Sequence, residues 1–313
     1  MKRLLSLALL AAPAAAQAPP TPLTPTSIVA AAPTAEWKAI DPADLLVMTL
    51  APDAAGQPRT VTIQLIPPPF SRGWTGNIRR LAKAHWWDGT SVYRVVDNWV
   101  TQWGDGEDNP AKAKPLPAGL KVVPESEYAI AAIATEPNFD DWTDGDPVID
   151  DNYAIGRFWH GWPLGRTYPG GPGTVVQNWP IHCYGTVGVA RDLDSTGTGA
   201  ELYAVIGQAP RQLDRNIAVV GRVIEGIENL STLPRGKGAA GVYDDPRLRV
   251  PILSVRLGNE LPEPPRFEYL DTAGATFARY VNVSANRHDP FYKVPAGGID
   301  ICNAKVPIRR VPQ

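Results

Sequence analysis

The sequence of 313 residues contains little cysteine and little histidine. There are two cysteines, Cys183 and Cys302, and four histidines. The histidines lie far apart along the chain, and only His182 adjoins a cysteine. Because a structural zinc ion needs four such ligands in tetrahedral geometry, a zinc site is poorly supported. The aspartates around residues 140–151 lack the regular spacing of a calcium loop. We therefore expect no metal and no cofactor.

Basic clusters and long apolar runs are also scarce. The formal net charge is −2, and no block of lysine and arginine stands out, so the sequence does not support a nucleic-acid partner. No segment approaches the ~18 consecutive apolar residues that a membrane-spanning helix needs. We therefore expect no membrane span.

The N-terminus has the order of features found in a secretory signal. Lys2 and Arg3 precede an apolar run over residues 4–12, and small residues follow at 14–16. This pattern predicts a signal peptide over residues 1–16 that is removed after Ala16, and hence a periplasmic or secreted protein. In an oxidising compartment two distant cysteines favour one disulfide, Cys183–Cys302. Two separate buried thiols remain the alternative.

Proline and glycine are abundant, with 33 and 28 residues, which favours many turns and short strands. Apolar and β-branched residues predict strands at 44–51, 59–66, 91–105, 183–191, 201–207, 217–224 and 249–258. Helical spacing follows the second strand, from Ser71, and recurs at 225–233. Because no βαβ repeats occur, a parallel sheet is not indicated. The sequence predicts a mostly β fold, a closed antiparallel barrel capped by two helices.

The rest of the chain divides around this barrel. Residues 17–40 are rich in proline and alanine and are predicted to form a linker. The barrel covers residues 41–258, and within it residues 106–180 form a long insertion that is predicted to be irregular. Residues 259–313 are a C-terminal extension, with one helix around 272–283, that is expected to pack on the barrel.

Two long polar side chains interrupt an apolar strand segment, "SVYRVVDNWVTQWGD". Arg94 and Gln102 lie in it eight residues apart. From strand statistics alone, both side chains would point to solvent, because arginine is rarely buried without a partner.

The same segment carries a resemblance to a known family. "VYRVVDNWVTQWGD" resembles the motif F-H-R-x-x-x-x-F-x-x-Q-x-G-D of the cyclophilin family of peptidyl-prolyl isomerases. Arg94, Gln102, Gly104 and Asp105 match it, and Trp99 stands where the family has phenylalanine. "TGNIRRL" and "GTVGVAR…GAELYAVIGQAPRQLDRNIAVVGRVIEGIENL" resemble further blocks of the family in the same order. The resemblance covers about residues 44–258.

The resemblance implies the cyclophilin-like barrel and a site without a cofactor. It assigns catalysis to Arg94 and Gln102. It assigns substrate binding to Trp99, Val100, Ala190, Arg191, Glu201, Tyr203, Gln212, Leu213 and Ile217. Besides Trp99, four of these depart from the family: Glu201 replaces a glutamine, Tyr203 a phenylalanine, Gln212 a tryptophan, and Ile217 a frequent histidine.

These residues predict a peptidyl-prolyl cis-trans isomerase that acts on X–Pro bonds of unfolded or folding exported proteins. The altered positions leave open a catalytically weak or inactive peptide-binding chaperone module. A third alternative is a carbohydrate-binding protein, which the tryptophans of "HWWDG" and "FWHGW" suggest. The oligomeric state stays undetermined.

Overall fold

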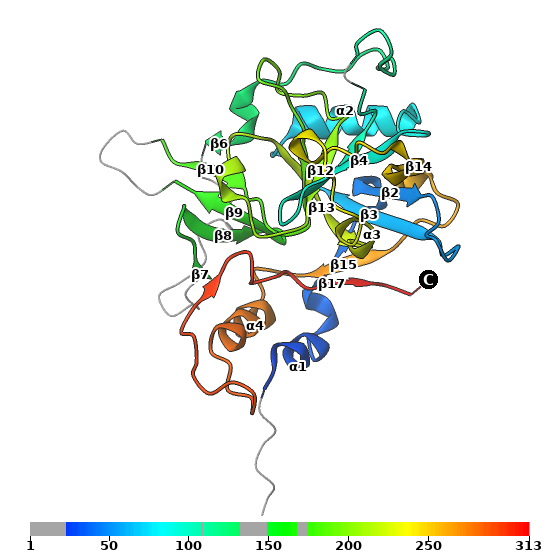
Figure 1. The fold of residues 1–313 in the computed structure, drawn as a ribbon. Helices are drawn as coiled ribbons and strands as arrows, with labels where there is room; N and C mark the ends of the chain where they lie inside the picture. The colour runs from blue at the N-terminus through cyan, green and yellow to red at the C-terminus, as the bar shows by residue number, and fades with distance from the viewer. Residues whose placement is uncertain (1–22, 108, 132–148, 168–174, 313) are drawn as a thin grey trace, which may run out of the picture.

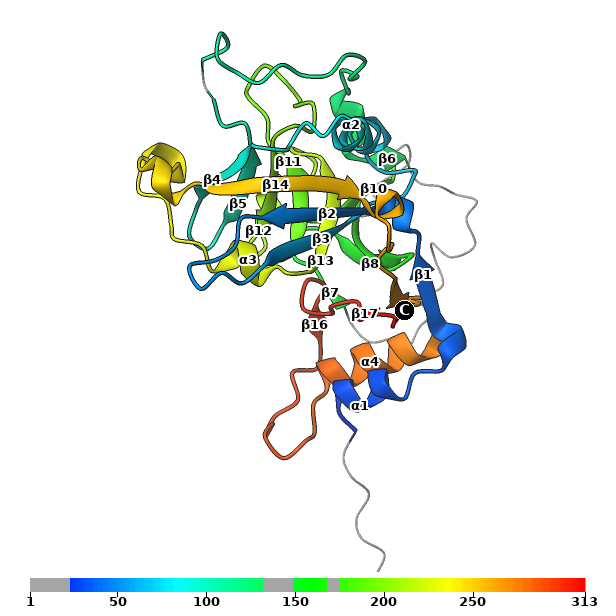
Figure 2. The ribbon, with the colours of Figure 1, turned by 90° about the vertical axis from the view of Figure 1, so that its right-hand side faces the viewer.

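Eight antiparallel strands close into a barrel in the computed structural model, which describes residues 23–107, 109–131, 149–167 and 175–312. The strand order is β11-β12-β5-β4-β14-β2-β3-β13, closing on β11 (Figures 1 and 2). The strands are β2 (Leu45–Leu50), β3 (Arg59–Leu65), β4 (Ser91–Val95), β5 (Val100–Gly104), β11 (Thr186–Val189), β12 (Leu202–Val205), β13 (Val219–Glu225) and β14 (Val250–Leu257). The predicted barrel is therefore confirmed.

The barrel is closed around one apolar core. Inward residues such as Met48, Ile63 and Val187 are buried, and alternate residues face outward, as expected for strands with one buried face. Two helices contribute to this core, as predicted. Helix α2 (Arg72–Lys83) adds Trp74, Ile78 and Leu81, and the short α3 (Glu228–Ser231) adds Leu230.

The insertion is not irregular throughout, so the prediction for residues 106–180 is wrong in part. It contains a four-stranded sheet in the order β6-β10-β9-β8, formed by β6 (Ile130–Ala131), β8 (Ile155–Trp159), β9 (Trp162–Arg166) and β10 (Gln177–Pro180). Strands β8 and β9 form a hairpin whose two loop residues, His160 and Gly161, both have positive φ. That backbone suits a two-residue hairpin turn. Because this segment is rich in glycine and aromatic residues, its sequence did not predict the hairpin.

The linker prediction is wrong for the described residues 23–40. They form helix α1 (Pro25–Ala30) and strand β1 (Trp37–Ile40). Strand β1 pairs with β15 (Phe267–Leu270), which pairs in turn with β17 (Ile308–Arg310). Helix α1 lies beside α4 (Ala275–Ala285), the predicted C-terminal helix (Figures 1 and 2). Long-range strand pairing therefore ordered a segment that has no amphipathic period of its own.

The C-terminal extension packs on the barrel. Phe267 of β15 shares an apolar cluster with Leu45 of β2. The disulfide Cys183–Cys302 is present, with the two Cα atoms 5.1 Å apart, so that prediction is confirmed. Strand β16 (Ile299–Asp300) pairs with β7 (Ile149–Asp150) of the insertion. Short 3-10 turns complete the chain: η1 (Thr34–Glu36), η2 (Pro42–Asp44), η3 (Glu125–Tyr128), η4 (Arg211–Leu213), η5 (Ala239–Gly241), η6 (Pro246–Leu248) and η7 (Gly258–Glu260).

Two predictions concern the N-terminus and membrane crossing. The predicted signal peptide lies outside the described residues, which begin at Leu23. Within the described part of the chain, no helix is long and apolar enough to cross a bilayer.

Candidate active site

One cross-strand row on the outer face of the barrel carries the two residues singled out in the sequence. Arg94 of β4 lies opposite Gln102 of β5, Gln102 lies opposite Tyr203 of β12, and Tyr203 lies opposite Gly188 of β11. Directly opposed residues of antiparallel strands project from the same face. The row is therefore continuous, and Gly188 is needed in it because a Cβ there would lie 2.3 Å from the Tyr203 hydroxyl.

Arg94 is half-buried and is held by two internal acceptors. Its Nη1 donates to Gln102 Oε1 at 2.7 Å, and its Nε donates to the carbonyl oxygen of Ala240 in η5 at 2.6 Å. Nη2 makes no hydrogen bond to the residues that the structure describes. Burial lowers the pKa of Arg94, yet arginine stays charged at physiological pH. The guanidinium thus has a fixed plane and a free pair of donors.

A chain of hydrogen bonds continues from Gln102 through Tyr93 to Glu201. Gln102 Nε2 donates to the Tyr93 hydroxyl, which donates to Glu201 Oε2 at 2.9 Å. The β4–β5 register shifts at Tyr93, and such a bulge re-aims side chains. Glu201 Oε1 accepts the backbone N–H of Asp105 at 2.8 Å.

Glu201 approaches the backbone closely at Gly104. A Cβ at Gly104 would lie 2.0 Å from the carboxylate, and the φ of Gly104 is 150°, so only glycine suits this position. Burial raises the pKa of Glu201, and the hydrogen bonds of Tyr93 and Asp105 offset only part of that rise. Burial and the adjacent Glu201 charge raise the pKa of Tyr93, so its hydroxyl remains a donor.

An apolar cluster lies beside the row on the same outer face. Val100 lies opposite Val205, two residues from Gln102 and Tyr203 respectively, so the four side chains share one face. The cluster consists of the buried Val100, Tyr203 and Val205 and the part-buried Trp99, Ala190, Leu213 and Ile217. An apolar surface thus borders a fixed cation.

A polar cavity of about 310 Å³ lies at the other side of Gln102. Its lining residues include Tyr93, Gln102, Ala190, Arg191 and Glu201. Ala190 belongs to both the apolar cluster and the cavity, so the two features adjoin.

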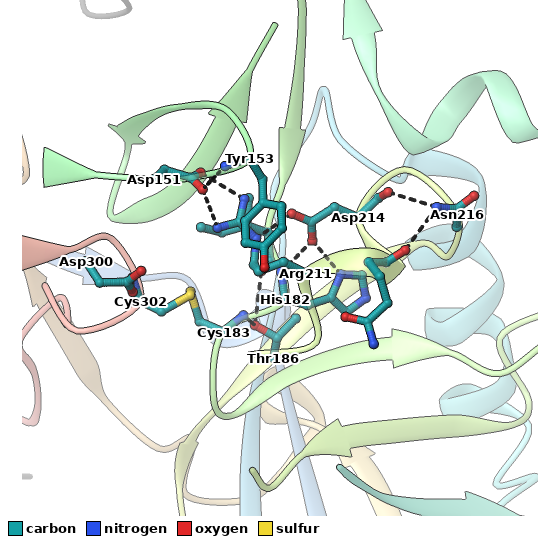
Figure 3. A network of polar contacts seen from close by, with 12 residues as sticks. Asp151, Tyr153, His182, Cys183, Thr186, Arg211, Asp214, Asn216, Asp300 and Cys302 are labelled. Atoms are coloured by element: carbon teal, nitrogen blue, oxygen red, sulfur yellow. Dashed lines mark hydrogen bonds and ion pairs between the residues drawn. A yellow bond between two sulfur atoms is a disulfide. The ribbon is translucent and has the colours of Figure 1, made fainter. Parts of the chain in front are cut away.

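The Tyr203 wall of the cluster is anchored by a buried network of charged residues, and Figure 3 shows its members His182, Asp214, Arg211 and Asp151. The Tyr203 hydroxyl is 2.8 Å from His182 Nε2, and His182 Nδ1 is 2.8 Å from Asp214 Oδ1. Arg211 of η4 donates to Asp214 Oδ2 at 2.6 Å, and its two terminal nitrogens donate to Asp151 at 2.8 Å. Figure 3 shows Arg211 between the two carboxylates.

The charges of this network are mutually compensated. Burial alone would raise the pKa of Asp214, but His182 and Arg211 outweigh it and lower that pKa. Burial would lower the pKa of Arg211, but Asp151 and Asp214 outweigh it and raise that pKa. Asp214 and Arg211 are therefore charged in the fold. Among the described residues, no group of three or more His, Cys, Asp or Glu side chains is arranged to hold a metal ion.

Comparisons with known proteins give the family of this chain. A family model described as "Cyclophilin type peptidyl-prolyl cis-trans isomerase/CLD" matches residues 74–257, more than half of the sequence. The chain belongs to the cyclophilin family. No curated protein matches. The cyclophilin AquaCyp293 from Hirschia baltica has a TM-score of 0.60 at 18% identity, covering 88% of this chain and 95% of that one.

A second cyclophilin structure is more distant. The Cryptosporidium parvum cyclophilin type peptidyl-prolyl cis-trans isomerase cgd2_1660, whose crystal structure was obtained in the presence of the dipeptide ala-pro, has a TM-score of 0.37 at 13% identity. The match covers 68% of this chain and 97% of that one. The AquaCyp293 match, at 88% of the chain, extends beyond the residues of the family model, so the fold of this cyclophilin is shared outside the barrel motifs.

The structure brings most of the predicted site residues of this cyclophilin together. Arg94, Gln102 and Tyr203 share the row, and Trp99, Val100, Ala190, Leu213 and Ile217 share the apolar cluster. Arg191 and Glu201 line the polar cavity instead. Gln212 is exposed and belongs to neither feature.

Sequence reasoning missed the roles of His182, Arg211, Asp214 and Asp151. The signal was Tyr203, because a buried tyrosine hydroxyl needs a hydrogen-bond partner that the phenylalanine of the family does not need. The carbohydrate alternative loses its basis, since Trp86, Trp87, Trp159 and Trp162 are all buried and offer no exposed platform.

Proposed function

We propose that this cyclophilin accelerates the cis-trans isomerisation of X–Pro bonds and that Arg94 is its catalytic residue. The observation that carries the proposal is the fixed guanidinium of Arg94 beside an apolar cluster. Gln102 and the Ala240 carbonyl hold two of its nitrogens, which leaves Nη2 for a substrate.

This geometry meets the requirements of X–Pro isomerisation. Rotation about the peptide bond has a barrier of ~18–20 kcal/mol because the nitrogen lone pair is delocalised into the carbonyl. In the twisted transition state the nitrogen becomes pyramidal and its lone pair is localised. A donor aimed at that nitrogen stabilises the twisted amide more than the planar one, which lowers the barrier without a nucleophile or metal.

We assign the surrounding residues by what they contact. The apolar cluster of Trp99, Val100, Tyr203, Leu213 and Ile217 would hold the proline ring. Gln102 is a positioning residue, since its amide oxygen fixes Arg94 and its amide nitrogen is engaged with Tyr93. Ala190, Arg191 and Glu201 would contact the residues that precede the proline, because they line the adjoining cavity.

The substrates proposed are proline-containing segments of exported proteins while they fold. The Cys183–Cys302 disulfide supports an oxidising compartment. Uncatalysed X–Pro isomerisation takes tens to hundreds of seconds, so a folding chain there would gain from the activity. The N-terminal pattern of Lys2, Arg3 and residues 4–16 supports the same compartment.

A peptide-binding module without useful catalysis is the second candidate. It is favoured by Gln212, which is exposed outside the apolar cluster where the family motif has a tryptophan. One experiment separates the two candidates: isomerisation of Ala–Pro and Phe–Pro tetrapeptides measured by NMR exchange, with peptide affinity measured by titration of the same samples. Catalysis predicts faster exchange with wild-type protein and not with Arg94→Ala. Binding with unchanged exchange rates would establish the module instead.

A further inference from the structure

A second cavity, of about 160 Å³, lies between the barrel and the C-terminal extension. Residues of β11 and β13 form one wall, residues of β8, β9 and β10 form another, and the segment around Cys302 covers it. The disulfide Cys183–Cys302 is itself part of the lining. The apolar lining residues include Phe158, Trp162, Ile181, Val219, Ile301 and Val306.

The charges at this cavity have one sign. Its only charged lining residues in the described part of the chain are Arg222 and the exposed Lys305, both cationic. A part-buried arginine is normally paired with a carboxylate, because an uncompensated charge in an apolar setting is costly. Arg222 has no carboxylate within salt-bridge distance among the described residues.

The hydrogen bonds of Arg222 go to neutral groups only. Nε and Nη2 donate to Gln64 Oε1 at 2.9 and 2.8 Å, and Nη1 donates to the Gly161 carbonyl oxygen at 2.6 Å. The guanidinium stacks over Trp162, 4.3 Å from the ring centroid. Burial lowers the pKa of Arg222 to about 9, and the neighbouring Tyr269 offsets only part of that fall. One N–H on each terminal nitrogen remains available.

Trp162 adds an unused donor to the same lining. Its buried indole N–H has no acceptor among the residues that the structure describes. A buried donor without a partner is uncommon in a folded protein. The lining of the cavity therefore combines apolar walls, an uncompensated cation and a tryptophan whose N–H is unpaired.

We propose that this cavity binds a small apolar monocarboxylate. The carboxylate would accept from the free N–H groups of Arg222 and from Trp162, and the apolar body would contact Ile181, Val219 and Ile301. Engineered apolar cavities of about 150 Å³ hold a benzene-sized molecule, so the apolar part is a phenyl ring or a chain of similar volume. An amine would meet two cations, and a neutral molecule would leave Arg222 uncompensated.

The test uses the full mature chain and three probes of one shape: phenylacetate, benzyl alcohol and benzylamine. Affinity is measured by isothermal titration at low and at physiological salt. Because hydrogen bonds to charged groups are stronger than neutral ones, phenylacetate should bind at least about tenfold more tightly than benzyl alcohol. Benzylamine should bind most weakly of the three.

Two variants and a control assign the binding to the cavity. Arg222→Gln should remove the preference for phenylacetate over benzyl alcohol. Val306→Trp should fill the cavity and abolish binding of both while leaving Arg222 in place, so it carries the test if Arg222→Gln does not fold. Arg247→Gln, at an exposed arginine elsewhere, should change nothing. Equal affinities of wild type for the acid and the alcohol, or undiminished phenylacetate binding to Val306→Trp, would overturn the proposal. Because no arm measures isomerisation, its outcome is independent of the proposed catalysis.

Discussion

Replacement of Arg94 by alanine is the perturbation that addresses the proposed mechanism most directly. It removes one preorganised donor and leaves the strand register and the apolar cluster in place. Loss of one such donor costs about 10²–10³-fold in rate in other enzymes. We therefore expect kcat/KM of Arg94→Ala on X–Pro peptides to fall by about 10²–10³-fold, with peptide affinity reduced much less, because the apolar contacts remain.

Two further variants test the fixed geometry rather than the charge. Arg94 uses Nε and Nη1 for internal acceptors and keeps Nη2 for the substrate. Lysine has a single nitrogen and no plane, so Arg94→Lys cannot satisfy Gln102, Ala240 and a substrate nitrogen together. We expect it to retain only a small part of the activity. Gln102→Leu removes the acceptor of Arg94 Nη1 at similar side-chain volume. The guanidinium would then be misplaced, which should lower kcat/KM by about tenfold or more.

The assay is NMR exchange on Ala–Pro and Phe–Pro peptides, with Arg247→Ala as the control. That arginine is exposed and lies away from the row, so its removal should leave kcat/KM within about twofold. Thermal unfolding of each variant checks the fold. Equal rates for wild type and Arg94→Ala would refute the catalytic role, and full activity of Arg94→Lys would refute the argument from the planar fork.

Four other outcomes are expected. Burial raises the pKa of Glu201 above its ordinary value of 4.5, so the fold favours neutral Glu201. The contribution of this group to stability therefore falls as pH rises through the raised pKa, which gives an inflection in the pH profiles of Tm and kcat/KM. Glu201→Gln should remove that inflection from both profiles. The pKa of Asp214 lies below its ordinary value of 3.8, so the contribution of Asp214 to stability is full above pH 3.8 and is lost on acidification. Asp214→Asn should therefore flatten the fall of Tm below pH 3.8, and an unaltered slope would contradict this. Cys183→Ser opens a link between residues 119 apart, and chain entropy allows a loss of up to ~4–5 kcal/mol in the free energy of unfolding; denaturant titration measures it, and no loss would speak against the link. Gln212→Trp restores the family's residue, and a rise in kcat/KM is expected only if the new ring reaches the apolar cluster; an unchanged value would place position 212 outside the groove.

The barrel could be predicted because its signals are local. Alternating apolar and polar residues in β3 mark one buried face, and that pattern depends on neither the insertion nor the extension. The pairing of Arg94 with Gln102 was accessible for a related reason. Arg94 and Gln102 are eight residues apart with a turn between them, and the antiparallel pair of β4 and β5 places them opposite each other. The family motif therefore contains two residues that are in contact in the structure.

The insertion and the N-terminal segment could not be predicted in the same way. Strand β1 forms only because β15 lies beside it, and their residues are more than 200 positions apart. Strands β8 and β9 depend on a His160–Gly161 turn, whose sequence is not among the common hairpin pairs. Gln212 was placed by motif position alone, and the motif does not specify on which side of η4 its side chain emerges.

The network behind Tyr203 could not be predicted because its members are distant in sequence. Tyr203 and His182 are 21 residues apart, His182 and Asp214 are 32 apart, and Arg211 and Asp151 are 60 apart. Each residue alone is unremarkable in its local segment. Only the barrel closure and the insertion together place Arg211 between two carboxylates.

The position of this network couples the proposed proline site to the segments outside the barrel. Asp151 directly follows β7, which pairs with β16 of the extension, and Arg211 begins the turn that carries Leu213 of the apolar cluster. Cys302 also follows β16, and its disulfide partner Cys183 adjoins His182. Two connections from the same strand of the extension therefore reach Leu213 and Tyr203. Because breaking a buried charge pair costs about 3–5 kcal/mol, these walls cannot shift freely, and the extension is part of what holds the apolar cluster in shape.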